Sequence, residues 1–300
     1  MCKGLFSRDD RGLAGITLLL ALGALVLIII SVLGVVMFVT AAPHIKNFAG
    51  SHIMDLLKDR VNIGHKDKVA IIYIEGSMVA DQSCDDDSSS CSSEVVKNLR
   101  KATSDPNVKA IVLRINSPGG TPVAAEEIIS QINRTKAVKP VVVSMGDIAT
   151  SAAYYVSSTT DKIYANPDTF TGSIGVIWVF KNRTKFYDDE GINYYIAKSG
   201  NFKDVGADWR GLSDNEKTYI QGIINESYDR FVSSVARGRN LSIDKVKSIA
   251  DGRVYTGTKA KDMGLIDEVG GLYDAVDQAA KLAHIKGKPE IVYMNDGPKK

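Results

Sequence analysis

The sequence predicts an α/β protein built on a mostly parallel β-sheet, preceded by one N-terminal transmembrane helix. Two patterns indicate the sheet: short β-branched runs recur along the chain, and segments with helical spacing of apolar residues lie between them. Strands that alternate with helices of about 10–15 residues are typical of parallel sheets. The third observation is an uncharged, strongly apolar run between Gly12 and Pro43, which predicts the membrane helix.

Composition excludes several classes of protein. The chain has 300 residues and a formal net charge of +2, so no basic surface for nucleic acid is expected. Its three cysteines, Cys2, Cys84 and Cys91, are too few for a disulfide framework and do not have the spacing of a zinc site. We therefore expect no nucleic-acid partner, and the serine chemistry considered below needs no metal and no cofactor.

The N-terminal apolar run is long enough to cross a bilayer, which takes about 20 residues. A cleavable signal peptide is the alternative, because Thr40-Ala41-Ala42 resembles a cleavage site, but its apolar core is only about 7–15 residues long. Length therefore favours an uncleaved anchor. We expect a tail at 1–11, the anchor at 12–42 and a stalk at 43–68.

The globular part is expected at 69–295, with a disordered tail at 296–300. Within it, patterning predicts strands at 69–76, 111–115, 141–143, 192–197 and 265–268. Helices are expected at 94–103, 123–132, from about 151 to 157, and at 181–190, 213–237, 242–250, 258–263 and 271–282. An acidic, serine-rich loop is expected at 82–93, and Cys84 and Cys91 could close it as a disulfide on an extracytoplasmic face.

Ser151 is the first candidate for chemistry. It lies between an apolar run, a turn at 144–147 and a helix of small residues, so we expect it at the helix N-terminus. Free backbone N–H groups at such a place suit a nucleophile whose intermediate carries an oxyanion. The alternative is that Ser151 serves only as an N-cap or as a small buried residue.

Two glycine-containing segments strengthen the first interpretation. Pro118-Gly119-Gly120 follows a buried strand and predicts a tight turn with exposed N–H groups, although an ordinary strand-to-helix turn would look the same. Ser173 lies between glycines in Thr171-Gly172-Ser173-Ile174-Gly175. The carboxyl ends of parallel strands, where both expected turns at Gly120 and Ser151 fall, are where sites gather.

The general base is expected to be a lysine. The four histidines, His44, His52, His65 and His284, leave the stretch from Lys66 to Ala283 without one, which argues against a Ser-His-Asp triad. Serine proteases with a Ser-Lys pair exist. Residue patterning does not choose between Lys198 and Lys203 as the base. The alternative for each of them is an ordinary lysine on the protein surface.

Four motifs, in this order and spacing, resemble the SppA-type signal peptide peptidases, which are membrane-anchored serine proteases with the Clp protease/crotonase-like fold. The motifs are Arg114-Ile-Asn-Ser-Pro-Gly-Gly120, Met145-Gly-Asp-Ile-Ala-Thr-Ser-Ala-Ala-Tyr-Tyr155, Thr171-Gly-Ser-Ile-Gly175 and Ala250-Asp-Gly-Arg-Val-Tyr-Thr-Gly257. The resemblance covers roughly residues 69–283 and implies a superhelix of repeated ββα units. One departure is Ala152-Ala153, where the family often has two glycines.

The resemblance also implies roles for residues. Ser151 would be the nucleophile, Lys203 the general base and Ser173 the hydroxyl that orients the lysine. The N–H groups of Gly119 or Gly120 and of Ala152 would form the oxyanion hole. A ring-like homo-oligomer is implied as well, in which serine and lysine can come from neighbouring protomers.

We therefore expect a serine endopeptidase that degrades cleaved signal peptides and other small membrane-released peptides. It would be a single-pass protein of the cell membrane, bound to the bilayer through 12–42, with its N-terminus cytoplasmic and its catalytic domain extracytoplasmic. Three alternatives remain: a related protease of the same fold that cuts stomatin-like proteins, a non-catalytic membrane scaffold, and a crotonase-type acyl-CoA enzyme.

Overall fold

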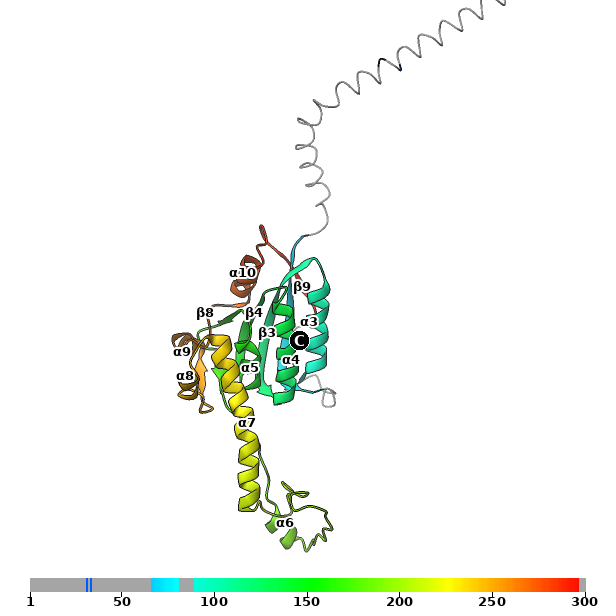
Figure 1. Ribbon diagram of the computed structural model, residues 1–300, viewed down its shortest axis with the longest axis vertical. Coiled ribbons are helices and arrows are strands. Elements are labelled where there is room, and N and C mark those ends of the chain that lie inside the picture. The colour runs from blue at the N-terminus through cyan, green and yellow to red at the C-terminus, as the bar shows by residue number, and fades with distance from the viewer. Residues whose placement is uncertain (1–30, 32, 34–65, 81–88, 297–300) are drawn as a thin grey trace, which may run out of the picture. The chain divides into compact units, whose positions relative to one another are not determined.

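The computed structural model describes Ser31, Leu33 and residues 66–80 and 89–296 (Figure 1). The chain divides into two units, Met1–His65 and Lys66–Lys300. Nearly all of the expected anchor and stalk lies outside the described residues, as do Cys84 and most of the expected tail. No helix within the described ranges is long and apolar enough to cross a membrane.

The second unit is an α/β structure whose described residues form one nine-stranded, mostly parallel sheet. The main order is β2-β1-β3-β4-β5-β8, with β6 beside β4, β9 beside β1, and β7 antiparallel to β6. The strands are β1 (Lys68–Val79), β2 (Ser89–Cys91), β3 (Val108–Gly120), β4 (Val141–Thr150), β5 (Lys162–Ala165), β6 (Phe170–Gly172), β7 (Val254–Thr256), β8 (Glu268–Val269) and β9 (Glu290–Tyr293).

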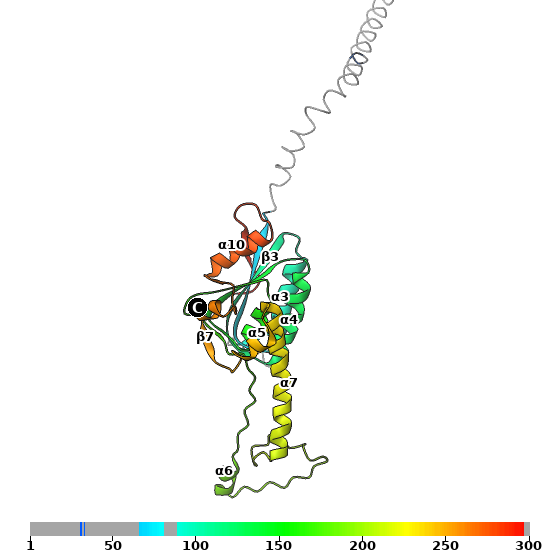
Figure 2. The same ribbon diagram turned by 60° about the vertical axis from the view of Figure 1, so that its left-hand side comes forward.

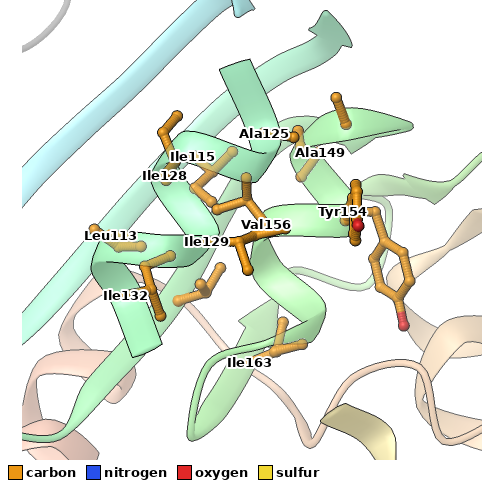
Figure 3. Close-up of a cluster of buried hydrophobic side chains, with 14 of the residues drawn as sticks. Leu113, Ile115, Ala125, Ile128, Ile129, Ile132, Ala149, Tyr154, Val156 and Ile163 are labelled. Atoms are coloured by element: carbon orange, nitrogen blue, oxygen red, sulfur yellow. The ribbon is translucent and has the colours of Figure 1, made fainter. Parts of the chain in front are cut away.

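Helices cover both faces of this sheet. One core packs α3 (Ser92–Ser104), α4 (Pro122–Lys136) and α5 (Ala152–Ser158) against it, and Figure 3 shows Ile128 and Ile132 meeting Leu113 and Val156 there. The other core packs α10 (Leu272–Leu282) on the opposite side. The remaining helices are α6 (Thr184–Asp189), α7 (Asp214–Arg239), α8 (Ile243–Lys247) and α9 (Gly257–Asp262).

The long helix α7 begins as the sequence predicts. The Ser213 hydroxyl accepts the N–H of Glu216, and the Glu216 carboxylate accepts the N–H of Ser213, which together form a capping box. Its C-terminal half packs against α5 and the core. Its N-terminal half projects from the sheet and carries α6 and the neighbouring loops at its far end (Figures 1 and 2).

Two predicted turns are strands instead. β3 continues through Pro118 to Gly120, and β4 continues through 144–147 to Thr150. Each extension has a parallel partner, since Gly119 and Gly120 pair with the end of β1 and Thr150 pairs with Gly172 of β6. The cause is non-local: ladder hydrogen bonds from distant strands override the local turn preference of these residues.

The expected strand at 192–197 was also wrong as a sheet element. These residues are exposed and pair with no strand among the described residues. The helices expected at 181–190 and 242–250 are present but shorter, the helix expected at 258–263 is α9 shifted by one residue, and the strand expected at 265–268 is reduced to β8. Strands β2, β5, β6, β7 and β9 were not predicted. In β2, Cys91 is disulfide-bonded, and its partner sulfur lies outside the described residues.

Candidate active site

Ser151 occupies the sharp turn between β4 and α5. Its backbone has φ +54° and ψ −124°, a conformation that costs free energy in any residue other than glycine. Two hydrogen bonds hold it there: its N–H donates to the Gly172 carbonyl at 2.9 Å, and its carbonyl accepts from the N–H of Tyr155 at 2.8 Å. The hydroxyl makes no capping hydrogen bond. Ser151 therefore occupies the N-cap position without capping the helix, in a strained backbone conformation of the kind that clusters at functional sites.

Sheet register brings Ser173 beside Ser151. Thr150 pairs with Gly172 across β4 and β6, so the two serines follow adjacent strands at the same level. Ser173 also has a positive φ of 49°, and its N–H donates to the Arg253 carbonyl at 2.9 Å. Both serines line one cavity. Two strained serines on one wall are the strongest structural sign of a functional site in this chain.

The glycines at the end of β3 face the same turn. A Cβ on Gly119 would lie 2.8 Å from the Ser151 Cβ and 3.0 Å from the Ala152 nitrogen. The Gly119 N–H donates to the Ser117 hydroxyl at 3.1 Å, whereas Gly120 and Ala152 line the cavity. Ala152 is the first residue of α5, so its N–H has no acceptor within the helix.

The cavity has a volume of about 750 Å³ and runs from the serines to α7. Its apolar side is formed by Tyr155, Ile177, Ile224, Tyr228 and Phe231, and Asp251 is the charged residue on its wall. A hydrogen bond from Arg253 lowers the pKa of Asp251, so this carboxylate is ionised at neutral pH. Sequence reasoning missed the contribution of α7; the apolar spacing within 220–231 is its only local signal.

Lys203 does not reach this cavity in the described chain. It belongs to the loop before α7, which lies at the projecting end of that helix (Figure 1). Its side chain is exposed. Within the described ranges it forms no ion pair, whereas the other candidate, Lys198, is 2.6 Å from the Asp204 carboxylate. The neighbouring aromatic residues Phe202 and Trp209 pack on Tyr219 and Tyr194.

Comparison with known proteins identifies the family. The model of peptidase family S49 matches residues 133–286. A putative protease of Methanocaldococcus jannaschii is 35% identical over 80% of this chain and 78% of its own length. The chain belongs to peptidase family S49.

Other S49 relatives have more specific names. A putative signal peptide peptidase SppA of Enterococcus faecium is 37% identical over 66% of this chain and 58% of its own. Protease 4 of Haemophilus influenzae is 36% identical over 72% of this chain but only 35% of its own. These names confirm the family that the motifs predicted.

A solved structure supports the fold of this S49 chain. A membrane-bound stomatin-specific protease aligns with a TM-score of 0.52 over 77% of this chain and 99% of its own, at 15% identity. Identity at that level shows a shared fold alone. Of the predicted site residues, the S49 fold thus gathers Ser151, Ala152, Ser173 and the two glycines, and leaves Lys203 at the far end of α7.

Proposed function

We propose that this S49 protein is a membrane-anchored serine endopeptidase that degrades cleaved signal peptides and other small membrane-released peptides. The observation that carries the proposal is the strained Ser151 at the mouth of an apolar cavity, beside the first N–H group of α5. Enzymes place nucleophiles on such strand-to-helix turns because the hydroxyl is exposed and N–H donors point at the developing oxyanion.

The proposed reaction is acyl transfer. The Ser151 Oγ attacks the scissile carbonyl while neutral Lys203 takes the hydroxyl proton. The N–H groups of Ala152 and of Gly120 or Gly119 stabilise the oxyanion, and Ser173 orients the lysine. The lysine then gives its proton to the leaving amine. Water, activated by the same lysine, hydrolyses the acyl-enzyme and releases Ser151.

We propose that the lysine comes from another copy of the chain. The Lys203 loop is joined to Glu216, at the start of α7, through Arg210, and Lys203 is not among the residues that line the Ser151 cavity. The α7 residues that line this cavity run from Gln221 to Phe231, so at about 1.5 Å per residue they lie roughly 8–22 Å along the helix from Glu216. A lysine from a neighbouring copy would complete the dyad without rearrangement of this loop.

The projecting end has the surface that self-association needs. Val179 and Tyr195 have exposed fractions of 73% and 95%, and the exposed 192–197 segment pairs with no strand among the described residues. Exposed apolar side chains favour association with another chain. We propose that a ring-like homo-oligomer covers this surface and delivers Lys203 to a neighbouring Ser151.

Substrate class follows from the cavity. Its wall of Tyr155, Ile224 and Phe231 would accept apolar or small side chains, such as those of signal-peptide cores. The expected anchor at 12–42 would hold the enzyme where such peptides are released, with the catalytic unit extracytoplasmic.

The experiment measures cleavage of a fluorogenic apolar peptide and a synthetic signal peptide by the full-length protein in detergent. We expect activity in the wild type and a loss of at least about 1,000-fold in both Ser151→Ala and Lys203→Ala. Activity that survives Ser151→Ala would overturn the nucleophile, and activity that survives Lys203→Ala would overturn the base. A peptide from a stomatin-like protein serves as the competing substrate: preference for it would overturn the signal-peptide assignment alone.

A further inference from the structure

The loop that carries Lys203 is fastened to α7 on both sides of the lysine. On one side, the ring of Phe202 packs on Tyr219 with a centroid distance of 5.1 Å. On the other side, Asp204 is joined to α7 through Arg210. Lys203 itself stays exposed between these two attachments. The chain thus fixes the neighbours of this lysine and leaves its amine free to meet another surface.

Arg210 makes a two-sided bridge. Its Nε and Nη2 donate to the two Asp204 carboxylate oxygens at 3.0 and 2.8 Å, and Nη2 also donates to the Asp204 carbonyl at 3.1 Å. Toward α7, its Nη1 and Nη2 donate to the Glu216 carboxylate at 2.9 and 2.6 Å. A guanidinium fork bound to two carboxylates has little rotational freedom, so the bridge fixes direction as well as distance.

Both carboxylates of the bridge are shielded from water. The side chains of Asp204 and Glu216 are 10% and 6% exposed. Hydrogen bonds from Arg210 lower the pKa of each of them, to about 2 for Glu216, so both stay ionised at neutral pH. Glu216 also closes the capping box of α7 with Ser213. The bridge is therefore built into the start of the helix.

We propose that Arg210, Asp204 and Glu216 form a positioning bridge that holds Lys203 where it can act as general base toward Ser151. The inference rests on the proposed function, because it specifies how that function's lysine is presented. A general base has to come within hydrogen-bond distance of its proton, and a displacement of about 1 Å can cost around 100-fold in rate. The same bridge holds Lys198 in an ion pair with Asp204, which keeps it from competing for the site.

The test compares Arg210→Ala, Arg210→Lys and Asp204→Asn in the full-length protein. We expect Arg210→Ala to lower kcat by about 10–100-fold with KM changed less than about twofold. Arg210→Lys keeps the positive charge but loses the forked guanidinium, so its kcat is expected to lie between those of the wild type and of Arg210→Ala. The acidic limb of the kcat–pH profile should move to higher pH in these variants, because a loosely held amine stays more solvated. Loss of folded enzyme would lower kcat without moving that limb.

The matched control is Lys217→Gln. Lys217 lies on the same turn of α7 and pairs with exposed Asp214 at 2.9 Å, and within the described part of the chain it forms no ion pair with the Lys203 loop. Its kcat and pH profile are expected to equal those of the wild type. If Arg210→Ala fails to assemble, the kcat values and pH profiles of Arg210→Lys and Asp204→Asn decide whether the bridge positions Lys203.

Wild-type kcat and an unmoved acidic limb in Arg210→Lys and Asp204→Asn would overturn the inference. That outcome, combined with an inactive Lys203→Ala, would leave the proposed function intact. An active Lys203→Ala would instead overturn the proposed base, and the positioning role with it.

Discussion

The backbone of Gly119 lies directly against Ser151, because a Cβ on the glycine would come within 2.8 Å of the serine Cβ. Gly119 also has φ +115°, a conformation that favours glycine. The contact joins the ends of β3 and β4, so the strand that carries the nucleophile candidate and the strand beside it cannot move independently.

Gly119→Ala is expected to lower peptidase activity by at least about 100-fold, because the new methyl group displaces Ser151 and the Ala152 N–H together. It should also lower the free energy of unfolding by about 1–3 kcal/mol through strain at positive φ. Peptide cleavage and thermal unfolding measure the two effects. A fully active Gly119→Ala protein would contradict the geometry assigned to the turn.

Mixing two inactive proteins is expected to restore activity. A Ser151→Ala subunit supplies Lys203, and a Lys203→Ala subunit supplies Ser151, so randomly mixed rings should regain about a quarter of the wild-type rate. The measurement is peptide cleavage after dissociation and reassembly of the two proteins together. A mixture as inactive as either parent would show that serine and lysine act within one chain, and the double variant mixed with wild type controls for dilution.

Two glycines of α7 are expected to respond oppositely to alanine. A Cβ at Gly238 would lie 1.8 Å from the Ser158 carbonyl oxygen, so Gly238→Ala should separate α7 from the end of α5 and cost about 1–3 kcal/mol. Gly222 has nothing within 4 Å of its Cβ position, so Gly222→Ala should gain about 0.8–1 kcal/mol of helix propensity. Denaturant unfolding of both variants makes the comparison. Equal effects would contradict the docking of α7 on α5.

Acidification is expected to destabilise the projecting end of α7, because it protonates the Glu216 carboxylate. Hydrogen bonds from Arg210 and the Ser213 N–H lower the pKa of this carboxyl to about 2, below its value of about 4.3 in an unfolded chain. Its stabilising contribution is therefore complete above pH of about 4.5 and is lost as pH falls toward 2. Fluorescence of Trp209, in the same loop, monitors the change. Glu216→Gln should remove this part of the pH dependence, and an unchanged profile in the variant would assign it to other groups.

Much of the architecture could be predicted from local signals. The capping box at Ser213 set the start of α7, and the β-branched runs set the cores of β1, β3 and β4. Ser151 was predicted at the start of a small-residue helix, and α5 begins directly after it, whereas the turn expected at 144–147 belongs to β4. The ends of β3 and β4, at Gly120 and Thr150, were not predicted, because their pairing partners lie far away in the sequence.

The sequence by itself determined the family, the α/β class and the short list of chemically able residues, because these depend on residue types in a fixed order and spacing. Only the tertiary structure decided which of them meet. Sheet register brings Ser151 and Ser173 together, while the loop of Lys203 is fastened to the start of α7 and does not line the cavity of the two serines. Register and helix length act between residues that are distant along the chain, and no local pattern encodes that separation.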